Sequence, residues 1–126
     1  MSEDPQHKPV DKRRQVHLTY DIVLDEKFRS LSSTAKDVYM IFLYKRVIPR
    51  SRGKRAHKVA NNGQIQFTQH EAKHKWGIPK TSFWRAMSQL LERGIVKVSH
   101  RGHGINHDVN LYELVGKWDG IIGFRV

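Results

Sequence analysis

His70, Glu71 and His74 are the side chains with the most evident capacity for chemistry. Their spacing matches the pattern H-E-x-x-H, in which two histidines one helical turn apart bind zinc and the glutamate acts as general base. Lys73 and Lys75 place positive charge inside and directly after this pattern, and the sequence identifies no third ligand. Glu71 also fits a helix-capping role. A zinc metallopeptidase that uses these three residues is therefore kept as a remote alternative.

Other residue types with catalytic potential are scarce. The chain has no cysteine, which excludes disulfides, thiolate zinc fingers, iron–sulfur clusters and cysteine nucleophiles. His100, His103 and His107 lie among glycines, which fix no coordination geometry, so we interpret them as part of a solvated loop. No pair of acidic residues suggests acid–base chemistry. We expect no catalytic residue, no bound metal and no cofactor, and hence no enzyme.

The distribution of charge is the strongest signal in the sequence. The 126 residues carry 23 Lys and Arg against 12 Asp and Glu, a net charge of +11. Residues 45–101 hold 14 basic and 2 acidic side chains, whereas residues 1–44 are balanced and residues 102–126 carry a net charge of −1. A field this one-sided attracts polyanions. We expect the cations of the central segment to converge on one face of the folded chain and to bind nucleic acid.

Length and hydropathy define the broad class of protein. The chain suits one domain, which we divide into a flexible N-terminal arm (1–15), a folded domain (16–115) and a C-terminal tail (116–126). Apolar residues in the tail are expected to dock on the domain or on a second subunit. No apolar run approaches the roughly 20 residues of a membrane span, so no membrane partner is expected. The arm lacks the apolar stretch of a signal peptide, and the absence of cysteine favours the cytoplasm.

Periodicity predicts the elements of the first half of the chain. Apolar residues alternate with mostly polar ones over residues 16–24, which is typical of a half-buried strand or extended segment. Apolar residues at helical spacing predict a helix over residues 33–47, with Ser32 as its N-cap. Residues 50–63 contain no acid and form a basic loop, which a short strand at residues 64–68 follows.

Capping and turn residues predict the elements of the second half. Thr68 and Glu71 form a capping box that opens a short helix, and Gly77 ends this helix. Pro79 fits the first turn of the next helix, which runs to about Arg93. Strands at residues 95–100 and 108–114 then make a hairpin around a loop that contains two glycines. The apolar face of the long helix is expected to consist of Phe83, Met87, Leu90 and Leu91.

The segment FTQHEAKHKWGIPKTSFWRAMSQLLERGIVKV carries a family resemblance. Its order of strand, short helix, Gly-Ile turn, amphipathic helix and hairpin resembles the winged helix-turn-helix family, over about residues 31–114. More loosely, LSSTAKDVYMIFLYK is similar to the first helix of winged-helix domains in plasmid and phage replication proteins and in some bacterial regulators. The resemblance implies an α+β fold, with a three-helix core, a small antiparallel sheet and a β-hairpin wing.

The resemblance also implies a set of binding residues. In this family the second helix of the helix-turn-helix enters the major groove of DNA. Arg can make two hydrogen bonds to guanine, and Ser and Thr can contact phosphates or bases. Wings commonly touch the minor groove or the backbone, and Arg101 is the candidate for that contact. The basic loop would add phosphate contacts without reading sequence. The candidate residues are Lys80, Thr81, Ser82, Trp84, Arg85 and Ser88 on the helix, Arg101 on the wing, and Arg50, Arg52, Lys54, Arg55 and Lys58 on the loop.

These inferences lead to one expected function and its alternatives. We expect the protein to bind double-stranded DNA in a sequence-specific manner, in transcriptional regulation or replication initiation. The expected location is the cytoplasm, in association with the nucleoid. An RNA-binding or protein-interaction module that reuses the same fold is the alternative. A homodimer would suit a two-fold operator, but the sequence does not decide the oligomeric state.

Overall fold

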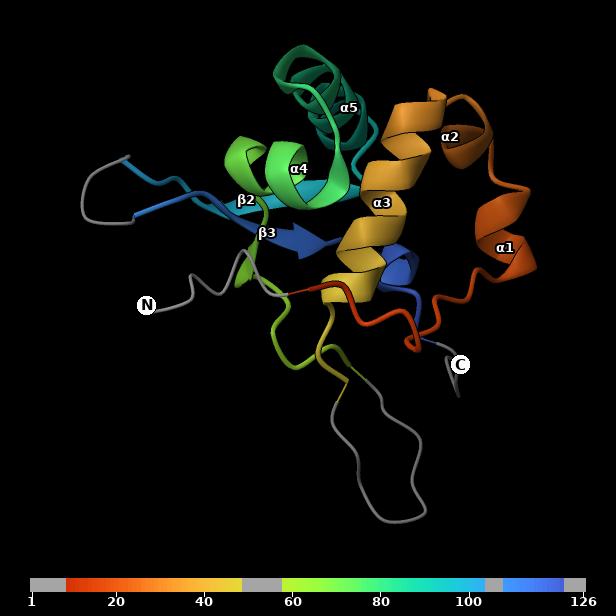
Figure 1. Ribbon diagram of the computed structural model, residues 1–126. Coiled ribbons are helices and arrows are strands. Elements are labelled where there is room, and N and C mark those ends of the chain that lie inside the picture. The colour runs from red at the N-terminus through yellow and green to blue at the C-terminus, as the bar shows by residue number, and fades with distance from the viewer. Residues whose placement is uncertain (1–8, 49–57, 104–107, 122–126) are drawn as a thin grey trace.

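The computed structural model describes residues 9–48, 58–103 and 108–121, and these residues form a mixed α+β fold (Figure 1). Two short helices precede a long one, and two further helices lie between the first strand and a hairpin. A 3₁₀ helix, η2, follows the last strand. The elements are α1 (Tyr20–Val23), α2 (Glu26–Arg29), α3 (Ser33–Lys45), β1 (Ile65–Gln66), α4 (Gln69–Trp76), α5 (Lys80–Glu92), β2 (Val96–His100), β3 (Leu111–Leu114) and η2 (Gly116–Asp119).

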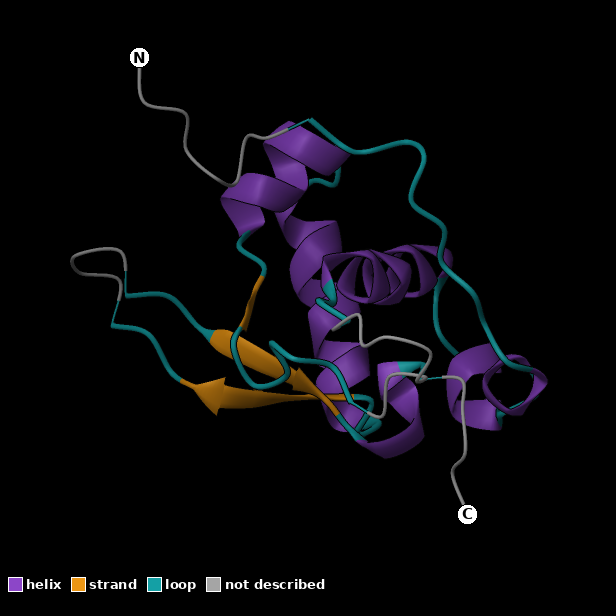
Figure 2. Cartoon of the chain, turned by 90° about the horizontal axis from the view of Figure 1, so that it is seen from below, coloured by secondary structure: helices purple, strands orange, loops and turns teal. Residues whose placement is uncertain are grey.

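The three strands form one antiparallel sheet with the order β1-β3-β2. Ile65 lies opposite Tyr112, and Tyr112 lies opposite Val98 on its other side. An irregularity between Val98 and His100 shifts the register near the end of β2. The β2–β3 hairpin extends beyond the helices on one side of the molecule (Figures 1 and 2). The sheet is therefore small, and its hairpin reaches away from the helical core.

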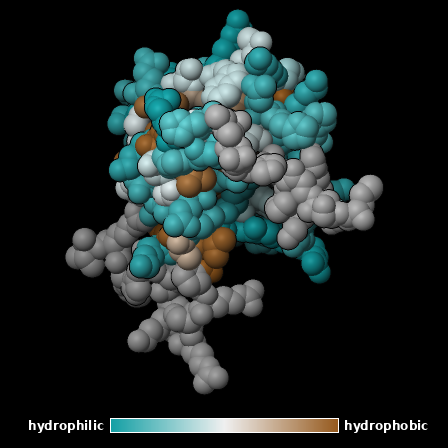
Figure 3. Space-filling view, turned by 90° about the vertical axis from the view of Figure 1, so that its left-hand side faces the viewer, coloured by the Kyte–Doolittle hydropathy of each residue, from teal (hydrophilic) through white to brown (hydrophobic). Residues whose placement is uncertain are grey.

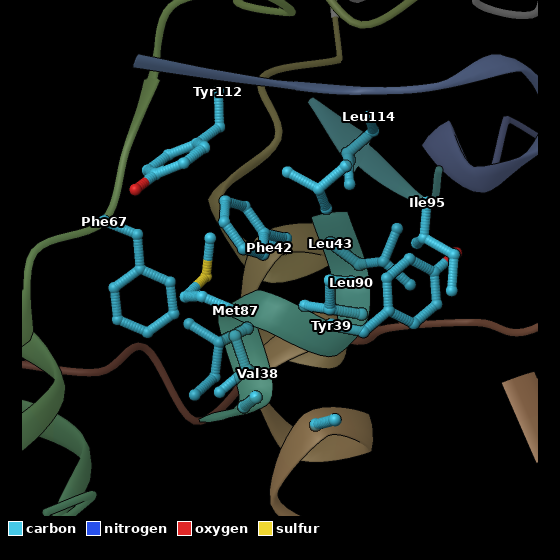
Figure 4. Packing of buried hydrophobic residues seen from close by; sticks show 14 of the residues in the cluster. Val38, Tyr39, Phe42, Leu43, Phe67, Met87, Leu90, Ile95, Tyr112 and Leu114 are labelled. Carbon is cyan, nitrogen blue, oxygen red and sulfur yellow. The ribbon is translucent and has the colours of Figure 1, made fainter. Parts of the chain in front are cut away.

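The core lies between α3, α5 and the sheet. Phe42 of α3 contacts Phe67 and Tyr112 edge to face, with ring centroids 5.4 and 5.6 Å apart (Figure 4). Edge-to-face packing adds to the burial of the rings because their quadrupoles attract at this geometry. Phe83 adds a further ring to this cluster, with its ring centroid 5.1 Å from that of Phe67. These aromatic contacts fix α3, α5 and the sheet relative to one another.

The predicted apolar face of α5 is confirmed for three of its four residues. Phe83, Met87 and Leu90 are fully buried, and Ala86 is buried with them. Leu91 was a wrong prediction because it is 37% exposed. At about 100° per residue, positions 86 and 91 flank this face on opposite sides, and the fold buries the side of Ala86 and exposes the side of Leu91.

The helix boundaries follow the predicted caps. The Ser32 hydroxyl accepts a hydrogen bond from the Ala35 amide at 3.1 Å, and the Thr68 hydroxyl accepts one from the Glu71 amide at 3.1 Å. Gly77 ends α4 in the left-handed conformation, with φ of 70°. Such a conformation is unstrained only for glycine among common residues, so the turn between α4 and α5 depends on it. Pro79 is the N-cap residue of α5, one position before the predicted first turn.

The prediction of a half-buried strand or extended segment over residues 16–24 is wrong for residues 20–23, which are helical. Residues 16–19 join no sheet, and residues 20–23 form helix α1. The Thr19 hydroxyl accepts a hydrogen bond from the Ile22 amide at 3.3 Å and so caps this helix. Only Ile22 of α1 is buried, whereas Tyr20 and Leu24 are 82% and 65% exposed. The apolar alternation therefore did not mark one buried face.

The residues that follow β3 dock on α3. The Tyr39 hydroxyl donates to the Trp118 carbonyl at 2.8 Å, and the Arg46 guanidinium donates to the Asp119 carbonyl at 2.8 Å. Trp118 and Ile121 are buried. Of the two expected docking partners, the domain itself receives residues 116–121. Within the described residues, no helix has the length and apolar character that crossing a bilayer requires.

Candidate nucleic-acid interface

The outward face of α5 forms an open hollow on the protein surface. Four residues are exposed on the side of α5 opposite its buried face, namely Thr81, Trp84, Arg85 and Ser88, and Lys80 is exposed at its start. Of the described residues that line this hollow, two are cationic and none is acidic. Ser82 is half-buried and lies outside the hollow, unlike the other candidates on this helix. The lining residues are Lys80, Thr81, Trp84, Arg85, Ser88 and Gln89.

Trp84 is held in place by a residue that the sequence did not indicate. Its indole Nε1 donates a hydrogen bond to Oε1 of Gln69, the first residue of α4, at 2.6 Å. Its ring also packs edge to face on Phe83, with centroids 5.1 Å apart. These contacts leave 41% of Trp84 exposed. Trp84 therefore belongs to the surface of α5, with its polar atom turned toward α4.

A second hollow lies between the start of α4 and the residues at which the loop of the β2–β3 hairpin leaves and rejoins the strands, which we call the hairpin base. It shares Trp84 with the first hollow. The indole is thus a common wall that joins the α5 face to the hairpin. The residues that line this second hollow are Phe67, Thr68, Gln69, Trp84, Gly102, Asp108, Val109, Asn110 and Tyr112.

Asp108 organises the base of the hairpin. His100 Nε2 lies 2.6 Å from one carboxylate oxygen of Asp108, and the His103 amide donates to the other at 3.1 Å. The hydrogen bond with His100 is the main reason why the pKa of Asp108 lies below its ordinary value. The Gly102 amide donates to the Asn110 side chain at 2.9 Å. The hairpin therefore has a network of cross-strand bonds that only the fold brings together.

Gly102 is required by close backbone contact. A Cβ atom at this position would clash with the Asp108 carbonyl oxygen and with the Val109 backbone. Glycine permits this close approach of the two backbone segments because it has no Cβ atom. Arg101 is exposed beside it. His107 and the other residues of the loop tip, 104–107, lie outside the described residues.

Two central cations are used inside the protein, which corrects the prediction that all of them share one face. The Lys45 ammonium donates to both carboxylate oxygens of Glu71, at 2.7 and 2.6 Å. Desolvation lowers the pKa of Lys45 despite this partner. Arg46 is buried and bonds to backbone carbonyls of Leu43 and Asp119. Both residues stabilise the core.

The basic loop contributes one described candidate. Lys58 is exposed but lines neither hollow. The other candidates in the loop, Arg50, Arg52, Lys54 and Arg55, lie outside the described residues.

Glu71 has a structural role in the H-E-x-x-H pattern. Its carboxylate is 1% exposed, and it accepts a hydrogen bond from Trp76 Nε1 at 3.2 Å in addition to those from Lys45. A carboxylate so occupied is not placed to activate water as a general base. His70 and His74 lie side by side, with ring centroids 4.3 Å apart. Among the described residues, no group of three His, Cys, Asp or Glu side chains is placed to hold a metal ion.

The side of the molecule to which the hairpin points is mostly hydrophilic where it is described, with only small hydrophobic areas (Figure 3). Comparison with protein-family models, curated protein sequences and solved structures gave no significant match. The functional assignment therefore depends on the geometry of the α5 face and the hairpin.

Proposed function

We propose that this chain is a winged-helix protein that binds double-stranded DNA in a sequence-specific manner. The order of helix α3, strand β1, helices α4 and α5, and the β2–β3 hairpin supports this family. The glycine turn between α4 and α5 supports it further, because it corresponds to the turn of a helix-turn-helix.

The observation that carries the proposal is the α5 face. It combines two cations, two hydroxyls and an indole on one exposed helical surface, with no acidic residue among the described residues that line it. The major groove is about 12 Å wide and admits an α-helix. With α5 in the groove, Arg85 would bond to guanine O6 and N7, and Lys80 would contact a phosphate.

The neighbouring hairpin supports a second point of contact. The hollow that contains Trp84 connects α5 to the hairpin base, and Arg101 is exposed on the hairpin. A hairpin beside a helix in the major groove reaches the adjacent backbone, where a guanidinium binds phosphate well. Transcriptional control and replication initiation both use such recognition, and the proposal covers both roles.

Substitution of Arg85 tests the proposal. Duplexes that bind the protein are selected from a random library, and affinities for the selected and for a random duplex are measured by fluorescence anisotropy. Arg85→Ala should weaken binding to the selected duplex by about 1–3 kcal/mol, because a bidentate contact with guanine is lost. Its affinity for random duplex should fall much less.

Arg29→Ala is the matched control, because Arg29 is exposed on α2 and lines neither hollow. It removes the same charge and should leave discrimination unchanged. If Arg85→Ala discriminates as well as the wild-type protein does, the recognition role of α5 is wrong. Stronger competition by RNA or single-stranded DNA than by duplex would instead support the RNA-binding alternative.

A further inference from the structure

Trp84 occupies the centre of the proposed interface. Its indole is the wall shared by the two hollows, so it lies between Arg85 on one side and the hairpin base on the other. A tryptophan that is 41% exposed on such a surface would meet any ligand that covers both hollows. Its chemistry therefore bears directly on what the interface selects.

The polar atom of the indole is already used. Tryptophan has one hydrogen-bond donor, Nε1–H, and no acceptor. In this structure that donor is bonded to Gln69 Oε1 at 2.6 Å. The rest of the Trp84 side chain is carbon. Trp84 therefore offers a ligand its ring carbons and not its hydrogen-bond donor, unless the bond to Gln69 breaks.

The major groove offers one strong apolar feature on its base edges, the C5 methyl group of thymine. We infer that Trp84 recognises the C5 methyl group of a thymine in the DNA site, held in position for this by Gln69. The inference rests on the proposed function and adds to it a requirement for thymine. Arg85 and Trp84 would then read different chemical features of the same site, a guanine edge and a pyrimidine methyl group.

Gln69 is the positioning residue in this arrangement. It begins α4 and is bonded to Trp84 across the turn that joins α4 to α5. Loss of its amide would free the indole to rotate and would expose an unpaired N–H to the groove. Gln69→Ala should therefore weaken methyl recognition without removing the apolar ring.

Replacement of thymine by uracil tests the inference, because uracil lacks only the methyl group. The selected duplex is resynthesised with deoxyuridine in place of each thymidine in turn. At one position we expect the dissociation constant to rise about fourfold, the effect of losing one buried methyl group. Trp84→Ala should remove this difference between thymine and uracil, and Gln69→Ala should reduce it.

Leu91→Ala is the matched control, because Leu91 is an apolar residue of α5 with similar exposure that lines neither hollow. It should keep the full difference between thymine and uracil. A second measurement needs no variant. A duplex with 5-iododeoxyuridine at the sensitive position should photocrosslink to the peptide that contains Trp84, because its iodine occupies the place of the methyl group.

Three results would overturn the inference while leaving the proposed function intact. They are equal binding of every uracil duplex and the thymine duplex, an undiminished difference in Trp84→Ala, and a crosslink to a peptide without Trp84. Absence of binding to any duplex would instead overturn the proposed function itself.

Discussion

The Glu71 carboxylate connects the ends of two helices. Lys45 is in the last turn of α3 and Glu71 is in the first turn of α4. Each charge is favourable at its own position, because the end of a helix attracts cations and its start attracts anions. Their ion pair therefore ties the end of α3 to the start of α4, from which Gln69 holds Trp84.

Removal of one partner of this pair should be costly. Glu71→Ala leaves the largely buried Lys45 ammonium without its carboxylate, and we expect a loss of about 3–5 kcal/mol in the free energy of unfolding, measured with urea. Glu113→Ala is the control, since its pair with Lys97 is more exposed and should contribute no more than about 1 kcal/mol. Similar losses in the two variants would contradict the structural role of Glu71.

Residue contacts divide into those that the sequence could predict and those that it could not. The Ser32 and Thr68 caps join residues three positions apart, so local spacing predicts them. The bond between Trp84 and Gln69 joins residues 15 positions apart on different helices. Its formation depends on the angle between α4 and α5, which no local pattern contains. The sequence therefore makes Trp84 a candidate binding residue but leaves open whether it completes a core or an interface, and it does not show which way its N–H points.

At the scale of elements, a prediction held where the apolar periodicity and a helix-capping residue indicated the same structure. Helix α3 had both signals, and it begins at Ser33 as predicted. Residues 16–24 had only an apolar alternation, and the cap at Thr19 produced a helix there. A strand also needs a partner, and the sheet edges are formed by β1 and β2. Residues 16–19 pair with neither edge, and a single-sequence pattern does not report whether such pairing forms.

The hairpin supplies a prediction about pH. Because the pKa of Asp108 lies below 3.8, the folded chain binds this proton less readily than the unfolded chain does. The contact with His100 therefore stabilises the fold above about pH 4 and is lost as the pH falls below 3.8. His100→Ala should raise the midpoint of the Asp108 carboxyl titration toward 3.8, as followed by carbon NMR.

His17→Ala is the control for this titration, because His17 is exposed in the segment before α1. It should leave the Asp108 midpoint where it is in the wild-type protein. An unchanged midpoint in His100→Ala would show that the His100–Asp108 contact does not hold the base of the hairpin in solution.

At the scale of the whole molecule, the fold separates structural cations from available ones. Lys45 and Arg46 are used by the core, whereas Lys80, Arg85 and Arg101 are exposed on α5 and the hairpin. The sequence contains a basic central segment, but it does not show which of its cations are buried and which are exposed. Burial depends on which elements pack together. The charge available to a polyanion is therefore smaller than the composition suggests.

Salt dependence measures how much of that charge is used. For duplex DNA, the logarithm of the binding constant falls linearly with the logarithm of salt concentration, with a slope of about −0.9 for each phosphate contacted. Lys80→Gln and Arg101→Gln should each reduce the magnitude of the slope by about 1 and weaken binding to all duplexes equally. Arg29→Gln should change neither quantity. If the slope is the same in Lys80→Gln and Arg101→Gln as in the wild-type protein, then the α5 face and the hairpin do not contact the DNA backbone together. This conclusion is independent of the result for Arg85→Ala.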